Sequence, residues 1–390
     1  MTRKLSVPAL PESTNTTRSR RKFLKAATGA VAAGATLGFP MIAKGQASPI
    51  SMRWQSTWPA KDIFHEFALD YAKKVNDMTG GELKIEVLPA GAVVPAFGLI
   101  DAVSKGTLDG GHGVLVYHYG KQNALALWGS GPAFGMDGNI LLSWHRYGGG
   151  KDLLNKLYAS LNLNVVSFPY GPHPTQPLGW YKKPITKPDD FKGLKFRTVG
   201  ISIDLFQGMG AAVNALPGGE IVPAMDRGLI EAAEFNNATS DRILGFPDVS
   251  KVCMLQSFHQ NAEQFEITFN KTKYDALPDK MKAIIAYAVD AANADMMWKA
   301  IDRYSQDYIE LQTKDKVKFY KTPDSVLRKQ LEIFDTVIDK RKDNPLFVEI
   351  LASQKKFAER AVRWDLDTYV DRRMAYNYYF GAKKAPEKKA

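Results

Sequence analysis

An arginine and a glutamate stand where two short apolar stretches end, and this placement could bind an organic anion. Arg197 follows the strand-like stretch GLKF, and Glu234 lies in a second such stretch, EAAEF. Ligands of open α/β sheets bind beyond the carboxyl ends of the strands. A planar guanidinium holds a carboxylate through two parallel hydrogen bonds, whereas a lysine offers only a point charge. The spacing therefore predicts a carboxylate site at Arg197. The alternative is a solvated arginine and an edge-strand glutamate without a ligand.

The elements that must position this pair follow an α/β pattern. Alternating apolar residues predict strands at 50–57, 83–88 and within 112–119, and helical spacing predicts helices between them. Strand–helix–strand order indicates parallel pairing and a doubly wound lobe. About 340 residues follow the first 47, too many for one ordinary core, so the sequence predicts two lobes. The proline-rich stretch GPHPTQPLGW (171–180) suits a hinge between them.

The residues around Arg197 and Glu234 also carry a family resemblance. KGLKFRTVG (192–200), followed by LPGGEIVPAMDRGLIEAAEF (216–235), resembles the periplasmic solute-binding proteins of tripartite ATP-independent (TRAP) transporters. Within that family it is most similar to the DctP-type branch that binds 2-oxo acids and related monocarboxylates. The resemblance implies a type II-like periplasmic binding fold with a ligand cleft between two lobes, a long strut helix and a helical C-terminal extension.

Site residues can be carried over from this resemblance position by position. The residues expected to contact the ligand are Arg197, Gln176, Tyr117, Phe235 and Gln260. The residues expected to hold a cation beside it are Gln176, Glu234, Phe235 through its carbonyl, and Gln260. Tyr117 would hydrogen-bond the polar end of the ligand. Gln176 has an alternative interpretation as an ordinary polar loop residue.

Two of these positions depart from the family pattern. Gln260 follows His259 where the 2-oxo acid binders carry a glutamate, and Phe235 stands where close relatives carry tryptophan. Gln260 keeps an oxygen but loses a negative charge, and cation affinity depends on the number of charged oxygen ligands. We therefore expect a weakened cation site. It would take sodium in preference to calcium, or the ligand would contact Arg197, Gln176 and Gln260 with no cation between.

The N-terminus indicates export. SRRKFLK (19–25) is a twin-arginine pattern, and a weakly apolar run and the small residues Gly45-Gln46-Ala47 follow it. These features predict a twin-arginine signal peptide at 1–47 and a periplasmic location. The formal net charge is +11, but the segment holds eight Lys or Arg and one acid, so 44 basic and 40 acidic residues follow it. That balance argues against nucleic acid as a partner.

The predicted domain organisation has four parts. They are the signal peptide (1–47), lobe 1 (48–174 with part of about 236–262), lobe 2 (175–235 with part of about 263–312) and a helical extension (313–390). The last helix, predicted to begin at Asn344-Pro345, carries more aromatic residues than one apolar stripe needs. The family's closest members dimerise through such a helix, so a homodimer is expected. Packing of the helix on its own lobe is the alternative.

Catalytic motifs do not occur in the sequence. It contains no HExxH, GxSxG or Walker pattern, and nothing pairs two carboxylates as acid and base. The resemblance instead implies a receptor, not an enzyme, that captures a small organic acid and delivers it to the integral-membrane subunits of a TRAP transporter. A twin-arginine-exported periplasmic enzyme acting on a carboxylate is the alternative.

Overall fold

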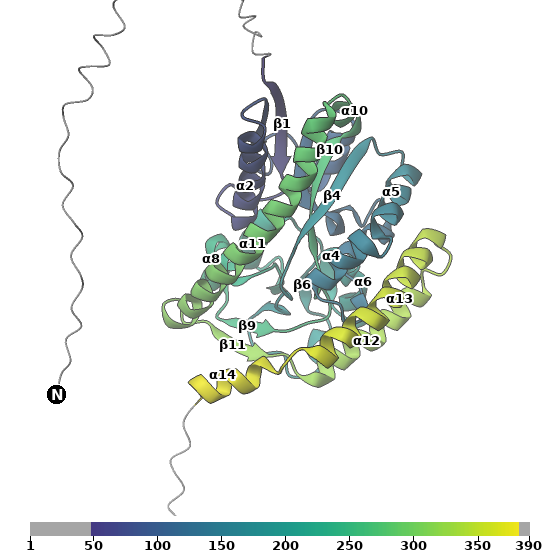
Figure 1. Cartoon of the computed structure of the whole chain (residues 1–390). Helices are drawn as coiled ribbons and strands as arrows, with labels where there is room; N and C mark the ends of the chain where they lie inside the picture. The colour runs from purple at the N-terminus through teal and green to yellow at the C-terminus, as the bar shows by residue number, and fades with distance from the viewer. Residues whose placement is uncertain (1–47, 382–390) are drawn as a thin grey trace, which may run out of the picture. The chain divides into compact units, whose positions relative to one another are not determined.

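The computed structural model describes residues 48–381, which form two α/β lobes, each built on its own β-sheet (Figure 1). This confirms the expected fold class. The predicted signal peptide and the charged tail from residue 382 lie outside the described residues. Within residues 48–381, every helix falls short of the length or the apolar character that a membrane span requires.

The sheet of lobe 1 has five strands in the order β2-β1-β3-β10-β4. The strands are β1 (Ile50–Ser56), β2 (Leu83–Leu88), β3 (Gly110–Val114), β4 (Val165–Pro172) and β10 (Gln264–Asn270). The helices are α2 (Ile63–Met78), η1 (Ala96–Gly98), α3 (Leu99–Ser104), η2 (Leu115–His118), η3 (Asn123–Trp128), η4 (Ala133–Gly135), α4 (Gly138–Tyr147), α5 (Gly150–Ser160) and α10 (Lys271–Asp275). β1 pairs in parallel with β2 and β3, as predicted. β10 inserts antiparallel between β3 and β4, and all its residues are buried.

The sheet of lobe 2 has six strands in the order β11-β9-β5-β8-β6-β7. The strands are β5 (Gly179–Tyr181), β6 (Lys195–Arg197), β7 (Ala212–Asn214), β8 (Ala232–Ala233), β9 (Val252–Leu255) and β11 (Lys318–Lys321). The helices are η5 (Pro188–Phe191), α6 (Ser202–Gly208), α7 (Gly218–Asp226), α8 (Ala238–Leu244) and α9 (Phe246–Val249). β6 and β8 are parallel neighbours, and Arg197 pairs with Ala233. Arg197 and Glu234 therefore leave the same edge of the sheet.

The segments that return to each lobe differ from the predicted boundaries. The sequence places part of about 236–262 in lobe 1 and part of about 263–312 in lobe 2. In the structure β9 pairs with β5 and β11 in lobe 2, whereas β10 pairs with β3 and β4 in lobe 1. β9 and β10 are both short strands, and the residue pattern of a short strand does not tell which sheet it joins. β11 also ties the start of the predicted extension, 313–390, into the sheet of lobe 2.

Three long helices pack on the two lobes, and one of them contacts both. The strut helix α11 (Asp279–Thr313) packs against α2 and β4 of lobe 1 and against α8 of lobe 2 (Figure 1). α12 (Asp324–Asp339) packs on α6, and α13 (Pro345–Thr368) packs on α4 and α5. The predicted single last helix is interrupted, because α14 (Arg372–Phe380) starts again at the capping residue Asp371.

A buried carboxyl group in lobe 1 gives a prediction about stability. Glu266, in β10, accepts hydrogen bonds from Tyr158 and Ser167, but burial still raises its pKa from 4.5 to about 7. The folded state therefore favours the protonated form, and stability is lost as pH rises from about 4.5 through 7.

We expect Glu266→Gln to flatten this dependence, since the amide does not ionise. Between pH 5 and pH 8 the variant should lose less unfolding free energy than the wild type, by on the order of 3 kcal/mol. Urea unfolding at both pH values measures the difference. If the unfolding free energies of the two proteins depend equally on pH, the pKa of Glu266 is not raised.

Candidate ligand-binding site

Arg197 and Glu234 form a buried ion pair at the carboxyl ends of β6 and β8. Arg197 Nη1 donates to Glu234 Oε1 at 2.7 Å and to the Glu234 carbonyl at 3.0 Å. Arg197 Nε donates to the carbonyl of Leu216, in the LPGGE loop, at 2.8 Å. The exposed fraction of the two side chains is 1% and 0%. The predicted convergence of this pair is therefore present, and the loop between the two strands takes part in it.

One donor nitrogen of Arg197 has no hydrogen-bond partner among the described residues. Nη2 is buried and makes no hydrogen bond to any residue in 48–381. An uncompensated buried donor is costly, and a guanidinium is an especially strong donor toward a carboxylate. Because Nε and Nη1 are already engaged, a ligand carboxylate meets Nη2 first. The bidentate contact with a carboxylate that the sequence predicts would require Nε or Nη1 to release its present acceptor.

The ring of Phe235 lies beside this arginine and helps to shape the site. Its centroid is 5.8 Å from Arg197 Cζ. The loop between the strands has a glycine at position 218, where a Cβ atom would lie 2.6 Å from the Phe235 ring. Gly218, the first residue of α7, therefore lets the loop pass close to the ring while Leu216 reaches Arg197.

A small cavity lies in front of Arg197 and is lined from both lobes. Its lining residues are Trp58, Phe64, Val114, Tyr117, His173, Gln176, Arg197, Val199, Phe235, Asn236, Gln260 and Glu263. The space left for the centre of a water molecule is only about 10 Å³, close to the minimum that one water needs. The lobes are thus closed on the site. An organic ligand would have to be admitted by their separation, as in hinged binding proteins.

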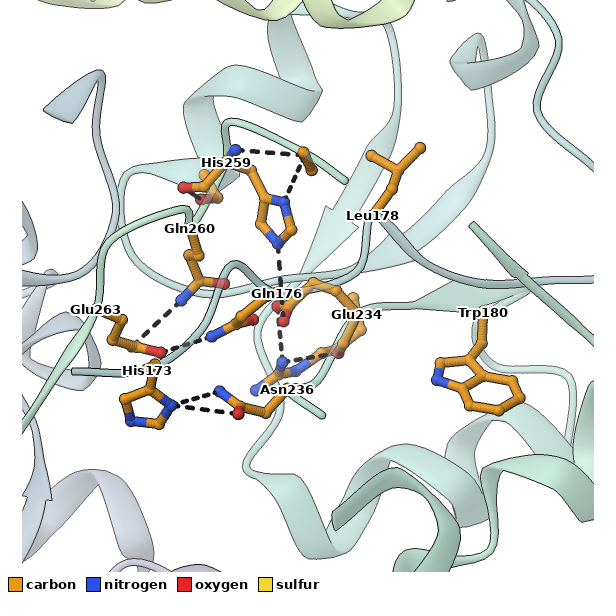
Figure 2. Close-up of polar contacts among 12 residues, drawn as sticks. His173, Gln176, Leu178, Trp180, Glu234, Asn236, His259, Gln260 and Glu263 are labelled. Atoms are coloured by element: carbon orange, nitrogen blue, oxygen red, sulfur yellow. Dashed lines mark hydrogen bonds and ion pairs between the residues drawn. The ribbon is translucent and has the colours of Figure 1, made fainter. Parts of the chain in front are cut away.

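The polar corner of the cavity contains two amides and a carboxyl group that the sequence analysis did not single out. Gln176 Nε2 donates to Glu263 Oε2 at 2.5 Å, and Gln260 Nε2 donates to Glu263 Oε1 at 3.4 Å (Figure 2). Burial, and then the negative charge of Glu234, raise the pKa of Glu263 to about 8. A cation beside Glu263 would offset both effects.

The donor atoms of this corner fit a hard cation. Oε1 of Gln176, Oε1 of Gln260 and Oε2 of Glu234 are buried and have no hydrogen-bond partner within the described part of the chain. Na⁺ and Ca²⁺ take carboxylate and amide oxygens of this kind. The described residues contain no group of three or more His, Cys, Asp or Glu suited to a metal. A metal here therefore depends on the amide oxygens.

His173 adds a ring nitrogen to the cavity lining, and its other ring nitrogen contacts a hydrogen-bond network that starts at a helix cap. Asn237 Oδ1 caps α8 by accepting from two backbone N–H groups, so its Nδ2 is the atom that donates to Asn236 Oδ1, at 2.8 Å. That contact turns Asn236 Nδ2 toward His173 Nδ1, 3.0 Å away. Nδ1 also lies 3.2 Å from Asn236 Oδ1. Burial lowers the pKa of His173 to about 3, so the ring is neutral. Its Nε2 is buried and has no hydrogen-bond partner among residues 48–381.

All five residues predicted to contact a ligand line this one cavity, and Glu234 adjoins it through Arg197. Burial raises the pKa of Tyr117, which leaves a neutral hydroxyl at the site. The structure records no contact of the Phe235 carbonyl that would test its predicted role. Sequence reasoning missed Trp58, Phe64, His173, Asn236 and Glu263. Only Glu263 left a signal, a carboxylate immediately before the strand QFEITFN.

Two lobes that close over one small polar cavity are the architecture of a binding receptor that traps its ligand. Sequence comparison gives the family. Residues 55–343 match the bacterial extracellular solute-binding proteins, family 7, also called DctP. The chain belongs to this family. Its members are solute-binding proteins that act outside the cytoplasm.

A curated relative and two solved structures agree with this assignment. The chain is 35% identical over 254 residues to a monocarboxylate 2-oxoacid-binding periplasmic protein of Nostoc, covering 65% of this chain and 69% of the relative. A TRAP transporter solute-binding protein from Bordetella bronchiseptica, a dimer with copurified calcium and picolinate, has TM-score 0.79 and 27% identity, covering 85% of this chain and 97% of that one. One from Pseudoalteromonas atlantica, with sodium and pyruvate, has TM-score 0.78 and 26% identity, covering 85% and 99%.

Proposed function

We propose that this protein is a periplasmic receptor that captures a small monocarboxylate, a 2-oxo acid or a related hydroxy acid, and delivers it to the membrane subunits of a TRAP transporter. The observation that carries the proposal is the buried, unpartnered Nη2 of Arg197 at a cavity closed between two lobes. The ligand carboxylate would take this donor. The names of the Nostoc and Pseudoalteromonas proteins, which mention 2-oxo acids and pyruvate, support the same class of ligand.

The rest of the cavity supports a small ligand with an oxygen next to its carboxylate. Trp58, Phe64 and Phe235 present apolar rings that suit a short side chain. Nε2 of His173 and the hydroxyl of Tyr117 are hydrogen-bonding groups suited to an oxo or hydroxyl oxygen. We further propose that Gln176, Glu234, Gln260 and the Phe235 carbonyl hold Na⁺ or Ca²⁺ beside the ligand. The side-chain oxygens of the first three that have no partner among the described residues support this.

Titration calorimetry with a matched set of compounds tests the proposal. Pyruvate and lactate should bind, and pyruvamide, which has the same shape without the charge, should bind at least about 100-fold more weakly because it lacks the charge-assisted pair. Equal affinity for pyruvate and pyruvamide would contradict a carboxylate receptor.

We also propose a homodimer through the end of α13 and α14. Residues of α13 up to Phe357 pack on lobe 1, but the aromatic residues beyond it are exposed, with Trp364 at 63% and Tyr379 at 71%. An exposed aromatic patch of this kind marks an interaction surface. The Bordetella relative, described as a dimer, supports a second copy as the partner.

Truncation after Thr368 removes α14 and should convert the dimer to a monomer. Light scattering coupled to size exclusion measures the mass. The control is a double substitution of exposed aromatics on other faces, Tyr147→Ser with Tyr287→Ser, which should leave the dimer intact. A full-length protein that is monomeric at high concentration would refute the proposed interface.

A further inference from the structure

Glu263 occupies a place in the cavity that neither the sequence pattern nor the comparisons assign. It immediately precedes β10, its side chain is 3% exposed, and no Lys or Arg pairs with it among the described residues. Instead each of its two oxygens accepts a hydrogen bond from a different amide, those of Gln176 and Gln260. Burying a carboxyl group without a cationic partner costs folding free energy. The contacts of Glu263 therefore indicate what its burial achieves.

Holding the amide nitrogens fixes where the amide oxygens point. An amide group is planar, and its oxygen lies opposite its NH₂ group. Because Glu263 holds Nε2 of Gln176 and of Gln260, both Oε1 atoms are turned away from Glu263, toward the side of Glu234 in the view of Figure 2. Both oxygens are buried and unpartnered within residues 48–381. Two buried amide oxygens that point to the same side form a set of ligands that suits a hard cation.

The balance of charge favours a divalent ion. In the cation-bound state, with Glu263 ionised against the cation as Glu234 is against Arg197, the two glutamates supply two negative charges and Arg197 supplies one positive charge. A monocarboxylate ligand would bring the total to minus two. A divalent ion neutralises that total, whereas a monovalent ion leaves one buried negative charge uncompensated.

We propose that Glu263 determines the cation specificity of the site, by orienting the amide oxygens of Gln176 and Gln260 and by supplying the charge that selects Ca²⁺ over Na⁺. This inference rests on the proposed function. It reverses the expectation of a weakened, sodium-preferring site, which followed from the neutral side chain of Gln260. The carboxylate is present in the corner, three residues further along the chain.

The test is calorimetric titration of metal-stripped mature protein with calcium chloride and, separately, with sodium chloride. The wild type should bind Ca²⁺ more tightly than Na⁺. Glu263→Gln should weaken Ca²⁺ binding at least tenfold and change Na⁺ binding less, so the ratio of the two affinities falls. Glu263→Asp, which keeps the charge, should retain most of that ratio. Glu266→Gln, the same change at a buried glutamate outside the cavity, should leave the ratio unchanged.

A compensating variant separates charge from folding. Gln260→Glu in the Glu263→Gln background returns one carboxylate to the same corner and should restore most of the Ca²⁺ affinity. An unchanged affinity ratio in Glu263→Gln, or a wild type that binds only Na⁺, would overturn the inference.

Pyruvate is titrated into the same samples with and without each cation. Pyruvate binding without any cation binding would reject the role of Glu263 and leave the receptor function standing. A folded wild type that binds none of the proposed acids, with or without cations, would reject the receptor function itself.

Discussion

Replacing Arg197 with alanine is expected to abolish measurable binding of pyruvate and lactate. Removing one partner of a buried charged contact costs about 2–5 kcal/mol, on the order of 30- to 4000-fold in affinity. Arg197→Lys should recover only part of this loss, because an ammonium group cannot reproduce the fork that now contacts Leu216 and Glu234. Calorimetry with pyruvate measures both variants.

A second buried arginine provides the control for Arg197. Arg341 pairs with Asp204 at 2.8 Å and with Tyr119, is 8% exposed, and is not one of the residues that line the cavity. Arg341→Lys should leave pyruvate affinity unchanged. Wild-type pyruvate affinity in Arg197→Ala would show that Arg197 does not bind the ligand carboxylate.

Replacing Glu234 with alanine is expected to lower stability by about 3–5 kcal/mol, since it leaves the guanidinium of Arg197 buried without its counter-charge. The double variant Arg197→Ala with Glu234→Ala should be more stable than the sum of the single effects predicts, because neither charge is then stranded. Denaturant unfolding of the four proteins measures the coupling. Additive losses would show that the pair is not energetically linked in the ligand-free state.

Some features of the site could be predicted because local sequence determines them. Arg197 and Glu234 each end a short strand, and two βα-type connections necessarily bring such ends to one edge of a sheet. The strut helix could also be predicted, because its apolar residues recur at helical spacing over many turns. Gln176 and Gln260 came from the family resemblance, and the structure places both at the cavity.

Other features depend on tertiary pairing that the sequence does not encode locally. β9 and β10 are both short strands, and only their partners decide which lobe each joins. The location of Glu263 also depends on tertiary pairing. It reaches the cavity only because β10 lies between β3 and β4 and carries the preceding turn there. The position of His173 at the cavity likewise depends on its contact with Asn236 and on the cap of α8.

Glu263 also shows how a departure from a family pattern can mislead. Gln260, taken alone, indicates a loss of charge at the cation corner. The structure places Glu263 within hydrogen-bonding reach of that same glutamine, so the corner retains a carboxyl group although the expected position is neutral. The number of charged groups in a site is a property of the fold, whereas a motif reports only one position at a time.

The most direct test of the receptor function is to identify what the protein carries and whether it changes it. The mature protein, purified without added ligand, is denatured and the released small molecules are analysed by mass spectrometry. Candidate acids labelled with ¹³C are then incubated with fresh protein and recovered. We expect a small monocarboxylate, a 2-oxo or hydroxy acid, that is displaced by excess pyruvate and returned chemically unchanged. Conversion of the labelled acid to a product, in the manner of a periplasmic enzyme, would contradict the account.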